Sequence, residues 1–511
     1  MKNIKKLSFT VVILAVLICL SACGRGNDEI ENTDVYVAEE PAAVNEVTEP
    51  ETPEAKEPTT DTVETGTAPE EPAAPNYIWE VWTLSHVDVD GWKEDIEQFR
   101  NIVFRWHPKF ADNTLNTLPR NIEMGIAFDE RIDQLLENVP NLTKFEILAE
   151  LQRALTILEN NFLQFGARSL LLRGAEETSF LHQLTLYRYL LEFGWFYDGF
   201  YLFRAAQSGY AALVLNHRLV AINDTPIENI FTEFQNFWSL DNIYNARSSF
   251  AHFLNSPGIL YALGVLDGQQ TTYTFLGDNQ ERISISVSES FPNRPPSTLF
   301  PFPIDWRLTL DEPLADNRVA GEIPLFLQNQ HQNSWYTFIE DYGLLYIRVN
   351  IHGFPNTEFI SNIIDLLGDV GEDLRATIID SRTNPGTDGD IFNFFDILVE
   401  ATPPGKLFYF INEGSLAASI SGGGALLYEL GATIIGQPSG QSIDFYAGAM
   451  PFFLPNSNFS LPLPVGVFTT RNLGFVSEDL IFRPHVLIEY TIDDWMNNHD
   501  PYLEYVLNLL R

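Results

Sequence analysis

Residues 407–460, LFYFINEGSLAASISGGGALLYELGATIIGQPSGQSIDFYAGAMPFFLPNSNFS, decide the fold of this chain. The aromatic and aliphatic run at 407–411 predicts a buried strand, and the small residues after it predict a turn into a helix over 419–431. A further strand is expected at 432–438, followed by a Gly/Pro loop and a polar hairpin. This order of strand, helix and strand is typical of a parallel sheet.

The residues before this stretch repeat the same alternation. Continuous β-branched and aromatic strands between helices predict a mostly parallel sheet that is covered on both faces. The segments read in order as strand, helix, strand, helix and strand: GLLYIRVN (343–350), EFISNIIDLLGDV (358–370), ATIIDSRTN (376–384), GDIFNFFDILVEA (389–401) and KLFYFINEG (406–414).

The first 23 residues have the pattern of a bacterial lipoprotein signal peptide. Three lysines precede the apolar run Phe9–Leu20, which is too short to span a membrane permanently and ends on Leu20-Ser21-Ala22-Cys23. We expect cleavage after residue 22 and lipidation of Cys23, with two or more acyl chains giving a stable anchor. The predicted location is the extracytoplasmic face of the cell membrane.

The composition limits the function classes. The chain has two cysteines, and both lie in or beside the signal peptide, so we expect no disulfide and no cysteine metal site in the mature protein. Residues 23–76 are rich in Glu, Pro, Thr and Ala, which predicts a disordered acidic linker. The formal charge of −39 becomes −42 when the three signal-peptide lysines are removed, which argues against nucleic-acid binding.

The rest of the chain is long enough for more than one domain. Residues 77–170 carry apolar positions three and four apart and predict a helical subdomain, in which Thr143 and Glu146 have the spacing of a capping box. Residues 171–330 give short strand signals and connectors, including a predicted hairpin over 270–288. Residues 331–511 form the predicted core. The fold class expected is therefore multidomain α+β or α/β.

These segments together resemble the S41 serine peptidases, the C-terminal processing or tail-specific family. The stretch GYAALVLNHRLVAINDTPIENIF (209–231) is similar to the strand, turn, strand and helix of a PDZ-like module, with Asp224 in place of the usual turn glycine. The order of the core, the hairpin text Leu454–Ser457 and the closing segment match one branch of the family. The resemblance covers most of Trp92–Arg511 and implies a PDZ-like module at 171–330 and a peptidase-like core at 331–511.

The resemblance also assigns positions to the catalytic machinery, and the residues found there lack the chemistry. The family nucleophile falls on Ala417, and a methyl group cannot attack a carbonyl. The lysine base falls on Gln441 or Ser442, and neither is a base near neutral pH. In the branch that uses histidine instead, Phe162 stands in its place. The glycine turn of the oxyanion hole corresponds to Gly386, with the second glycine displaced to Gly389, and Ala418 is a further oxyanion or peptide-binding position.

Three hypotheses on function follow. The first is a lipid-anchored protein that has lost catalysis and binds extended peptide or protein segments by strand addition. The second is an active S41-type endopeptidase that uses a displaced serine, Ser415 or Ser419, although serines at the start of a helix more often act as caps. The third is a solute-binding lipoprotein. No cofactor is expected, and the nine scattered histidines predict no metal site.

Overall fold

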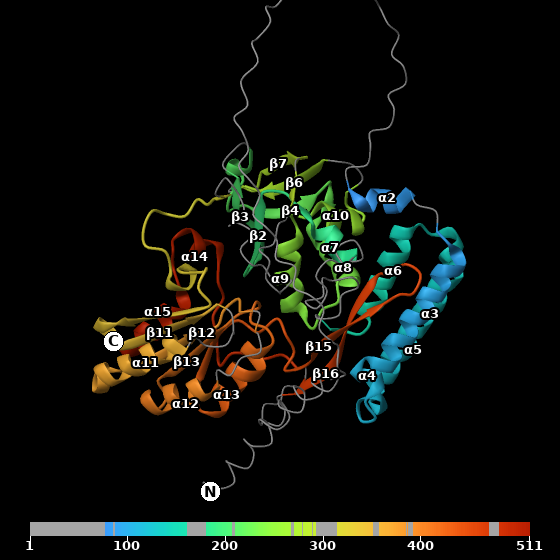
Figure 1. Ribbon diagram of the computed structural model, residues 1–511. Coiled ribbons are helices and arrows are strands. Elements are labelled where there is room, and N and C mark those ends of the chain that lie inside the picture. The colour runs from blue at the N-terminus through green and yellow to red at the C-terminus, as the bar shows by residue number, and fades with distance from the viewer. Residues whose placement is uncertain are drawn as a thin grey trace, which may run out of the picture. The chain divides into compact units, whose positions relative to one another are not determined.

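The computed structural model is shown in Figure 1. The residues that it describes are 77–84, 87–160, 180–206, 210–266, 270–277, 279–288, 290–292, 314–350, 357–384, 386, 392–469 and 480–511. The predicted signal peptide, the lipidation site Cys23 and the acidic linker all lie outside these residues. Within the described residues, none of the helices combines the length and the apolar character needed to cross a membrane.

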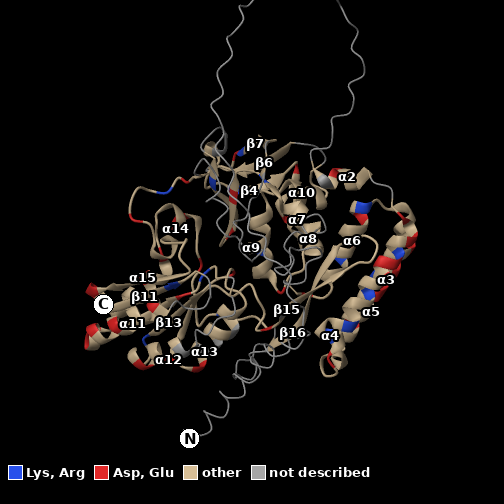
Figure 2. Cartoon of the chain, viewed as in Figure 1, with Lys and Arg blue, Asp and Glu red and all other residues tan. Residues whose placement is uncertain are grey.

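The N-terminal part is helical, as the sequence predicts. The Thr143 hydroxyl accepts the N–H of Glu146, and the Glu146 carboxylate accepts the N–H of Thr143, so the predicted capping box is confirmed. Figure 2 shows that acidic and basic residues occur together along α3 and α5. Arg100 of α3 pairs there with Asp129 and Asp133 of α5. The helices are α2 (Ile78–Leu84), α3 (Val89–Trp106), α4 (Pro108–Ala111), α5 (Pro119–Asn138) and α6 (Lys144–Thr156), with 3₁₀ turns at Leu115–Thr117 and Val139–Asn141.

An antiparallel sheet follows, with main strand order β2-β3-β4-β6-β7. The predicted hairpin over 270–288 is confirmed as β6 and β7. Asn223 and Asp224 make the turn after β4 with φ of 46° and 63°, a conformation that Asn and Asp tolerate. The elements of this part are α7 (Phe180–Thr185), β1 (Tyr187–Arg188), β2 (Leu191–Phe196), β3 (Gly199–Ala206), a 3₁₀ turn (Tyr210–Leu213), β4 (Arg218–Ile222), β5 (Thr225–Pro226), α8 (Ile227–Phe237), α9 (Ile243–Phe253), α10 (Pro257–Ala262), β6 (Thr271–Leu276), β7 (Arg282–Val287), β8 (Phe291–Pro292) and β9 (Leu314–Ala315).

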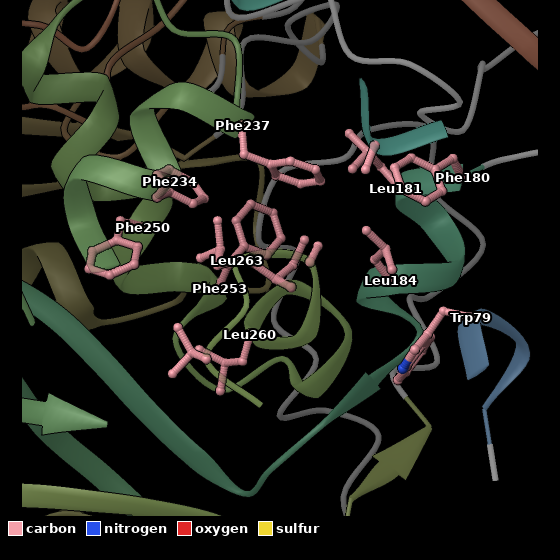
Figure 3. Close-up of a cluster of buried hydrophobic side chains, with 14 of the residues drawn as sticks. Trp79, Phe180, Leu181, Leu184, Phe234, Phe237, Phe250, Phe253, Leu260 and Leu263 are labelled. Atoms are coloured by element: carbon pink, nitrogen blue, oxygen red, sulfur yellow. The ribbon is translucent and has the colours of Figure 1, made fainter. Parts of the chain in front are cut away.

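One hydrophobic core joins the N-terminal helices to this sheet. Figure 3 shows Phe234 and Phe250 of α8 and α9 close to one another, with Leu260 and Leu263 of the following segment nearby. Buried side chains of α2, α3, α5, α6 and α7 belong to the same cluster. The helical segment and the sheet are therefore packed as one body rather than as separately cored domains.

The C-terminal part is built on a six-stranded sheet, order β10-β11-β12-β13-β14-β17. Neighbouring strands from β11 to β17 run parallel, and only the edge strand β10 is antiparallel, so the predicted mostly parallel sheet is confirmed. The strands are β10 (Ser334–Ile339), β11 (Leu344–Val349), β12 (Ala376–Asp380), β13 (Leu407–Ile411), β14 (Thr433–Gly436) and β17 (Val486–Leu487).

Helices cover both faces of this sheet, which explains why its strands are continuously apolar. Side chains of α11, α12 and α13 pack on one face, and those of α15 pack on the other (Figure 1). The helices are α11 (Thr357–Val370), α12 (Phe392–Ala401), α13 (Ala425–Glu429), α14 (Ile492–Met496) and α15 (Pro501–Leu510), with 3₁₀ turns at Leu325–Leu327, Glu340–Tyr342 and Gly371–Asp373.

A long hairpin, β15 (Asp444–Phe453) and β16 (Ser460–Thr469), links this part to the N-terminal helices. Its tip is held by the buried carboxylate of Asp95 on α3, which accepts the N–H groups of Asn456 and Ser457 at 2.8 and 2.7 Å. The hairpin text that the sequence singled out at Leu454–Ser457 therefore serves as an anchor to α3.

Candidate functional site

The turn after β13 carries the residue to which the resemblance assigns the nucleophile. Asn412 organises the turn, because its Oδ1 accepts the N–H groups of Gly414 and Thr383 at 3.1 and 2.7 Å. Ala417 then adopts a φ of 45°, in the left-handed region that is uncommon for a residue with a Cβ atom. Strained backbone of this kind concentrates at functional turns.

The segment after this turn differs from the regular helix that the sequence predicts over 419–431. Ser419–Gly424 forms a π-helical turn, and only Ala425–Glu429 is α-helical. A Cβ atom on Gly423 would lie 2.7 Å from the Tyr409 hydroxyl, and one on Gly424 would lie 2.9 Å from the Phe482 ring. The glycines therefore allow close packing, and packing rather than helix propensity sets the local geometry.

The turn after β12 packs directly against the turn of Ala417. Gly386 has a φ of 69°, and a Cβ atom there would lie 2.4 Å from the Leu416 carbonyl oxygen and 2.8 Å from the Ala417 Cβ. The Leu416 N–H donates to the Asn384 carbonyl at 2.8 Å. The structure therefore brings Gly386 and Ala417 together, and a Cβ atom at Gly386 would also lie 2.5 Å from the Ala418 nitrogen. The Gly386 N–H itself donates to Asn384 Oδ1 at 2.9 Å.

Gln441, at one of the two positions that the resemblance gives for the base, also meets Ala417. Its Oε1 accepts the Ala417 N–H, and its side chain is fully buried. The loop is fixed by the Ser439 hydroxyl, which donates to the Gln441 carbonyl at 2.7 Å. Ser442 is half-buried and pairs with Ile481 in an isolated antiparallel bridge. Phe162 and Gly389, the other two predicted positions, lie outside the described residues.

The two serines considered as displaced nucleophiles are fully buried and bonded to the backbone. The Ser415 hydroxyl donates to the Ser381 carbonyl at 2.8 Å and accepts the Asn412 N–H at 3.0 Å. The Ser419 hydroxyl donates to the Leu416 carbonyl at 2.7 Å. Neither hydroxyl bonds to an imidazole or an amine of the described residues, and both hydroxyls hold the turn through main-chain hydrogen bonds.

Glu413 is a titratable side chain of this turn that the sequence analysis did not single out. Burial raises its pKa to about 7, although its own backbone N–H and the charge of Arg247 act in the opposite direction. Its Oε2 is enclosed and has no hydrogen-bond partner among the residues that the structure describes. A single Glu in a polar turn gives no sequence signal of this burial, because the enclosing residues come from distant segments.

Two further buried ionisable residues, His107 and Lys109, lie in the WHPK segment at the start of α4. Burial lowers the pKa of His107 to about 3 and that of Lys109 to about 8. The Lys109 ammonium donates to the Leu158 carbonyl and lies 5.2 Å from the Tyr446 ring centroid. The Lys109 contacts therefore connect α4 to Leu158, just after α6, and to Tyr446 of β15. The position that the resemblance assigns to a histidine, Phe162, follows Leu158 closely in the sequence.

A buried charge network lies at the carboxyl end of β12. The carboxylate of Asp380 pairs with Arg348 at 2.9 Å and with Arg382 at 2.5 Å, and Arg382 also pairs with Asp500 at 2.9 Å. The Tyr346 hydroxyl donates to Asp380 at 2.7 Å. Burial alone would raise the pKa of Asp380, but the two guanidinium groups outweigh it and hold the pKa at about 2. The network positions the residues that lead into the Gly386 turn.

Among the described residues, no group of three or more His, Cys, Asp and Glu side chains is arranged to hold a metal ion. The arrangement around Ala417 thus offers backbone donors, a neutral amide and one carboxyl group of raised pKa.

Comparison with known proteins identifies the fold. No family model and no curated protein matches the chain. Among solved structures, it is similar to mature CPAF, with 11% sequence identity over 83% of this chain and 96% of that one and a TM-score of 0.53. The photosystem II D1 C-terminal processing protease matches over 82% and 97% of the two chains, with 12% identity and a TM-score of 0.36. A putative S41 protease from Bacteroides fragilis matches over 63% and 82%, with 10% identity and a TM-score of 0.26. The chain has an S41-protease-like α+β multidomain fold, as the sequence predicts.

Proposed function

We propose that this chain is a catalytically inactive protein with an S41-peptidase-like fold, which binds extended peptide or protein segments and is held at the outer face of the cell membrane by lipidated Cys23. The proposal has three parts, inactivity, binding and anchoring, and each depends on different residues.

The contact between Ala417 and Gln441 carries the proposal of inactivity. A serine peptidase needs a hydroxyl nucleophile within reach of a base, together with donors that face the developing oxyanion. The two assigned positions meet in space, but they hold a methyl group and a neutral amide. The Gln441 Oε1 also takes up the Ala417 N–H, a backbone donor that would otherwise be free to stabilise an oxyanion.

The alternative of an active endopeptidase has less support. Ser415 and Ser419 are fully buried, and their hydroxyls bond to main-chain groups rather than to a His or Lys side chain. An isolated hydroxyl without a base is a weak nucleophile. No observation favours the solute-binding alternative.

The hairpin next to the site supports the proposal of peptide binding. β15 begins at Asp444, three positions after Gln441, and its residues Gly448–Met450 are exposed. An exposed strand segment of this kind can accept an extended peptide through main-chain hydrogen bonds. We propose that the ligand adds to β15 and that its first carbonyl groups reach the turn of Ala417.

The experiment uses fluorescein-labelled casein, a chain without a stable fold, and the protein without its signal peptide and Cys23. We expect the fluorescence anisotropy of casein to rise on binding while no acid-soluble fragments are released. We also expect no labelling by a fluorophosphonate, either in this protein or in the Ala417→Ser variant, because Gln441 and Ser442, the positions assigned to the base, carry no basic group to activate the hydroxyl. An active S41 peptidase assayed in parallel is the positive control.

Stoichiometric fluorophosphonate labelling at any serine, or release of casein fragments, would contradict the proposed inactivity. Casein anisotropy that does not change at any protein concentration would contradict the proposed binding. The two parts of the proposal are therefore tested separately.

Anchoring is tested at Cys23. We expect the Cys23→Ala variant to lose metabolic incorporation of palmitate and to remain unprocessed, because the thiol that would carry diacylglycerol is missing. Cys19→Ala is the matched control, since this cysteine lies within the apolar run and should be discarded with the signal peptide. Equal palmitate incorporation in the Cys23→Ala variant and the unmodified protein would rule out the lipoprotein assignment.

A further inference from the structure

We propose that His499 acts as a pH-dependent clasp, which bridges the carboxylates of Asp494 and Glu504 and so keeps α14 docked against strands β2 and β3. This inference goes beyond the proposed function and does not depend on inactivity, peptide binding or anchoring. It concerns the contact between the antiparallel sheet and the C-terminal part of the chain, in which α14 is the connecting element.

α14 contacts the antiparallel sheet through the buried side chain of Trp495. The Phe203 ring of β3 meets the Trp495 ring edge-on, with the ring centroids 4.9 Å apart. The guanidinium groups of Arg204 and Arg318 lie 4.9 and 4.5 Å from the centroid of the same ring. Edge-on aromatic contacts and cation–π contacts are both favourable, so Trp495 holds α14 on this sheet.

Main-chain hydrogen bonds on both sides of Trp495 reinforce this contact. The Tyr197 N–H, just after β2, donates to the Tyr490 carbonyl at 3.2 Å. The Val319 N–H donates to the Met496 carbonyl at 2.8 Å. The amides of Tyr197 and Val319 belong to segments outside α14, so their protection from solvent reports whether α14 is docked.

α14 depends on contacts from outside, because it is only five residues long and a helix of this length is not stable alone. Its first turn is capped, since Asp494 Oδ2 accepts the Thr491 N–H at 2.8 Å and the Thr491 hydroxyl accepts the Asp494 N–H at 3.1 Å. The other oxygen of this carboxylate, Oδ1, lies 2.6 Å from the Nδ1 atom of His499. The cap of α14 and the histidine therefore share one carboxylate.

His499 lies between two carboxylates, one on each helix. Its Nδ1 atom contacts Asp494 as described, and its Nε2 atom is 2.5 Å from Oε2 of Glu504 in the first turn of α15. An ionised carboxylate only accepts hydrogen bonds, so both ring nitrogens must carry a proton for both contacts to be hydrogen bonds. The imidazolium form meets this condition. The neutral ring has one N–H, and at one of the two contacts its lone pair would face a carboxylate oxygen.

Protonation of His499 therefore decides whether the bridge is complete. Burial alone would lower the pKa of His499, but the hydrogen bonds and charges of Asp494 and Glu504 outweigh burial and raise the pKa. The folded protein thus binds this proton more tightly than an unfolded chain, in which the pKa of histidine is about 6.5. The bridge contributes fully below about pH 6.5, and its contribution is lost as the pH rises through the folded value.

The neighbouring charged groups are engaged elsewhere. Arg318, which reaches the side chain of Asn498, pairs with Asp316 at 2.9 Å. Asp500, the residue after His499, pairs with Arg382 at 2.9 Å. The shift of the His499 pKa comes from Asp494 and Glu504. The remaining titratable residues of α14, α15 and the end of the chain are Asp493, Tyr502, Tyr505 and Arg511.

The test follows hydrogen–deuterium exchange at the Tyr197 and Val319 amides of the full chain by mass spectrometry, at pH 6 and pH 8.5, with correction for the intrinsic exchange rate. Exposed ion pairs contribute modestly, so we expect the protection of both amides to fall by about three- to fivefold between the two pH values. In His499→Gln we expect the lower protection at both pH values. In His499→Arg we expect the higher protection at both, because a guanidinium stays charged.

His331→Gln is the matched control, since it removes an exposed histidine far from α14 in the sequence and should leave the pH response unchanged. A pH response that disappears in both His499 variants supports the clasp. An equal response in His499→Gln and the unmodified protein would overturn it, because another group would then be titrating. A response confined to the amides of α14, with Tyr197 and Val319 unchanged, would also overturn it, since His499 would then stabilise the helix without holding its docking.

Discussion

Replacement of Arg382 by Met is expected to lower the free energy of unfolding by about 3–5 kcal/mol, because it removes the guanidinium that pairs with the buried Asp500 and leaves Asp380 with Arg348 alone. Arg382 is 3% exposed and bonds to Asp380 and Asp500 on strand and helix segments that are 120 positions apart. Its guanidinium also lies 4.0 Å from the Phe326 ring centroid. Met has a similar length but cannot donate a hydrogen bond, so the loss measures the charge pairing more than the packing.

Urea unfolding at pH 7, followed by tryptophan fluorescence, measures this effect. The matched control is Arg120→Met, which removes the exposed pair of Arg120 and Glu159 and should cost less than about 1 kcal/mol. Equal losses in the two variants would mean that the buried network contributes no more than a surface pair. If Arg382→Met does not fold, Arg348→Met removes the other partner of Asp380 and tests the same network.

The network also sets the acid stability of the core. Because the pKa of Asp380 is about 2 in the folded protein and near 4 in an unfolded chain, its contribution is complete above pH 4 and is lost as the pH falls toward 2. Arg382→Met removes the largest attractive charge that lowers this pKa. The difference in stability between the variant and the unmodified protein should therefore shrink in acid.

The strands and the helices could be predicted because their signals are local. The continuous apolar runs at 344–349, 376–380 and 407–411 contain the β-branched and aromatic residues of buried parallel strands, and the structure has strands there. The capping box of Thr143 and Glu146 is a four-residue pattern and formed as predicted. The contact between Ala417 and Gln441 was expected from the family resemblance, because no periodic pattern in the sequence brings these two residues together.

The remaining features depend on contacts between distant segments. The first part of the helix predicted over 419–431 is a π-helical turn, Ser419–Gly424, in which Gly423 and Gly424 pack against Tyr409 and Phe482, and α-helix forms only at Ala425–Glu429. Burial raises the pKa of Glu413, and the sequence around Glu413 gives no sign of this burial. Lys109 has the sequence context of a surface lysine near a helix start, but tertiary packing buries it. Sequence patterns record the local preferences of a residue and not its final surroundings.

Gly386→Ala should disrupt the site turn, whereas Gly405→Ala should not, although both glycines have left-handed backbones with φ of 69° and 72°. The conformational cost of Ala in this region is about 1–2 kcal/mol at either position. A Cβ atom at Gly405 meets no atom within 4 Å, whereas one at Gly386 lies 2.4 Å from the Leu416 carbonyl oxygen and 2.5 Å from the Ala418 nitrogen. The steric overlap should add about 1–3 kcal/mol at Gly386 alone.

The larger effect is expected on binding, because the Gly386 turn and the Ala417 turn are in direct contact. A displaced Ala417 turn alters the main-chain groups that follow β13, including those of Glu413 in the same turn. We expect casein binding to fall by about tenfold or more in Gly386→Ala and to stay within about twofold in Gly405→Ala, measured by anisotropy below the unfolding transition of each variant. Equal affinity in the two variants would mean that the ligand does not depend on the turn between Gly386 and Ala417, so that its binding site lies elsewhere on the protein.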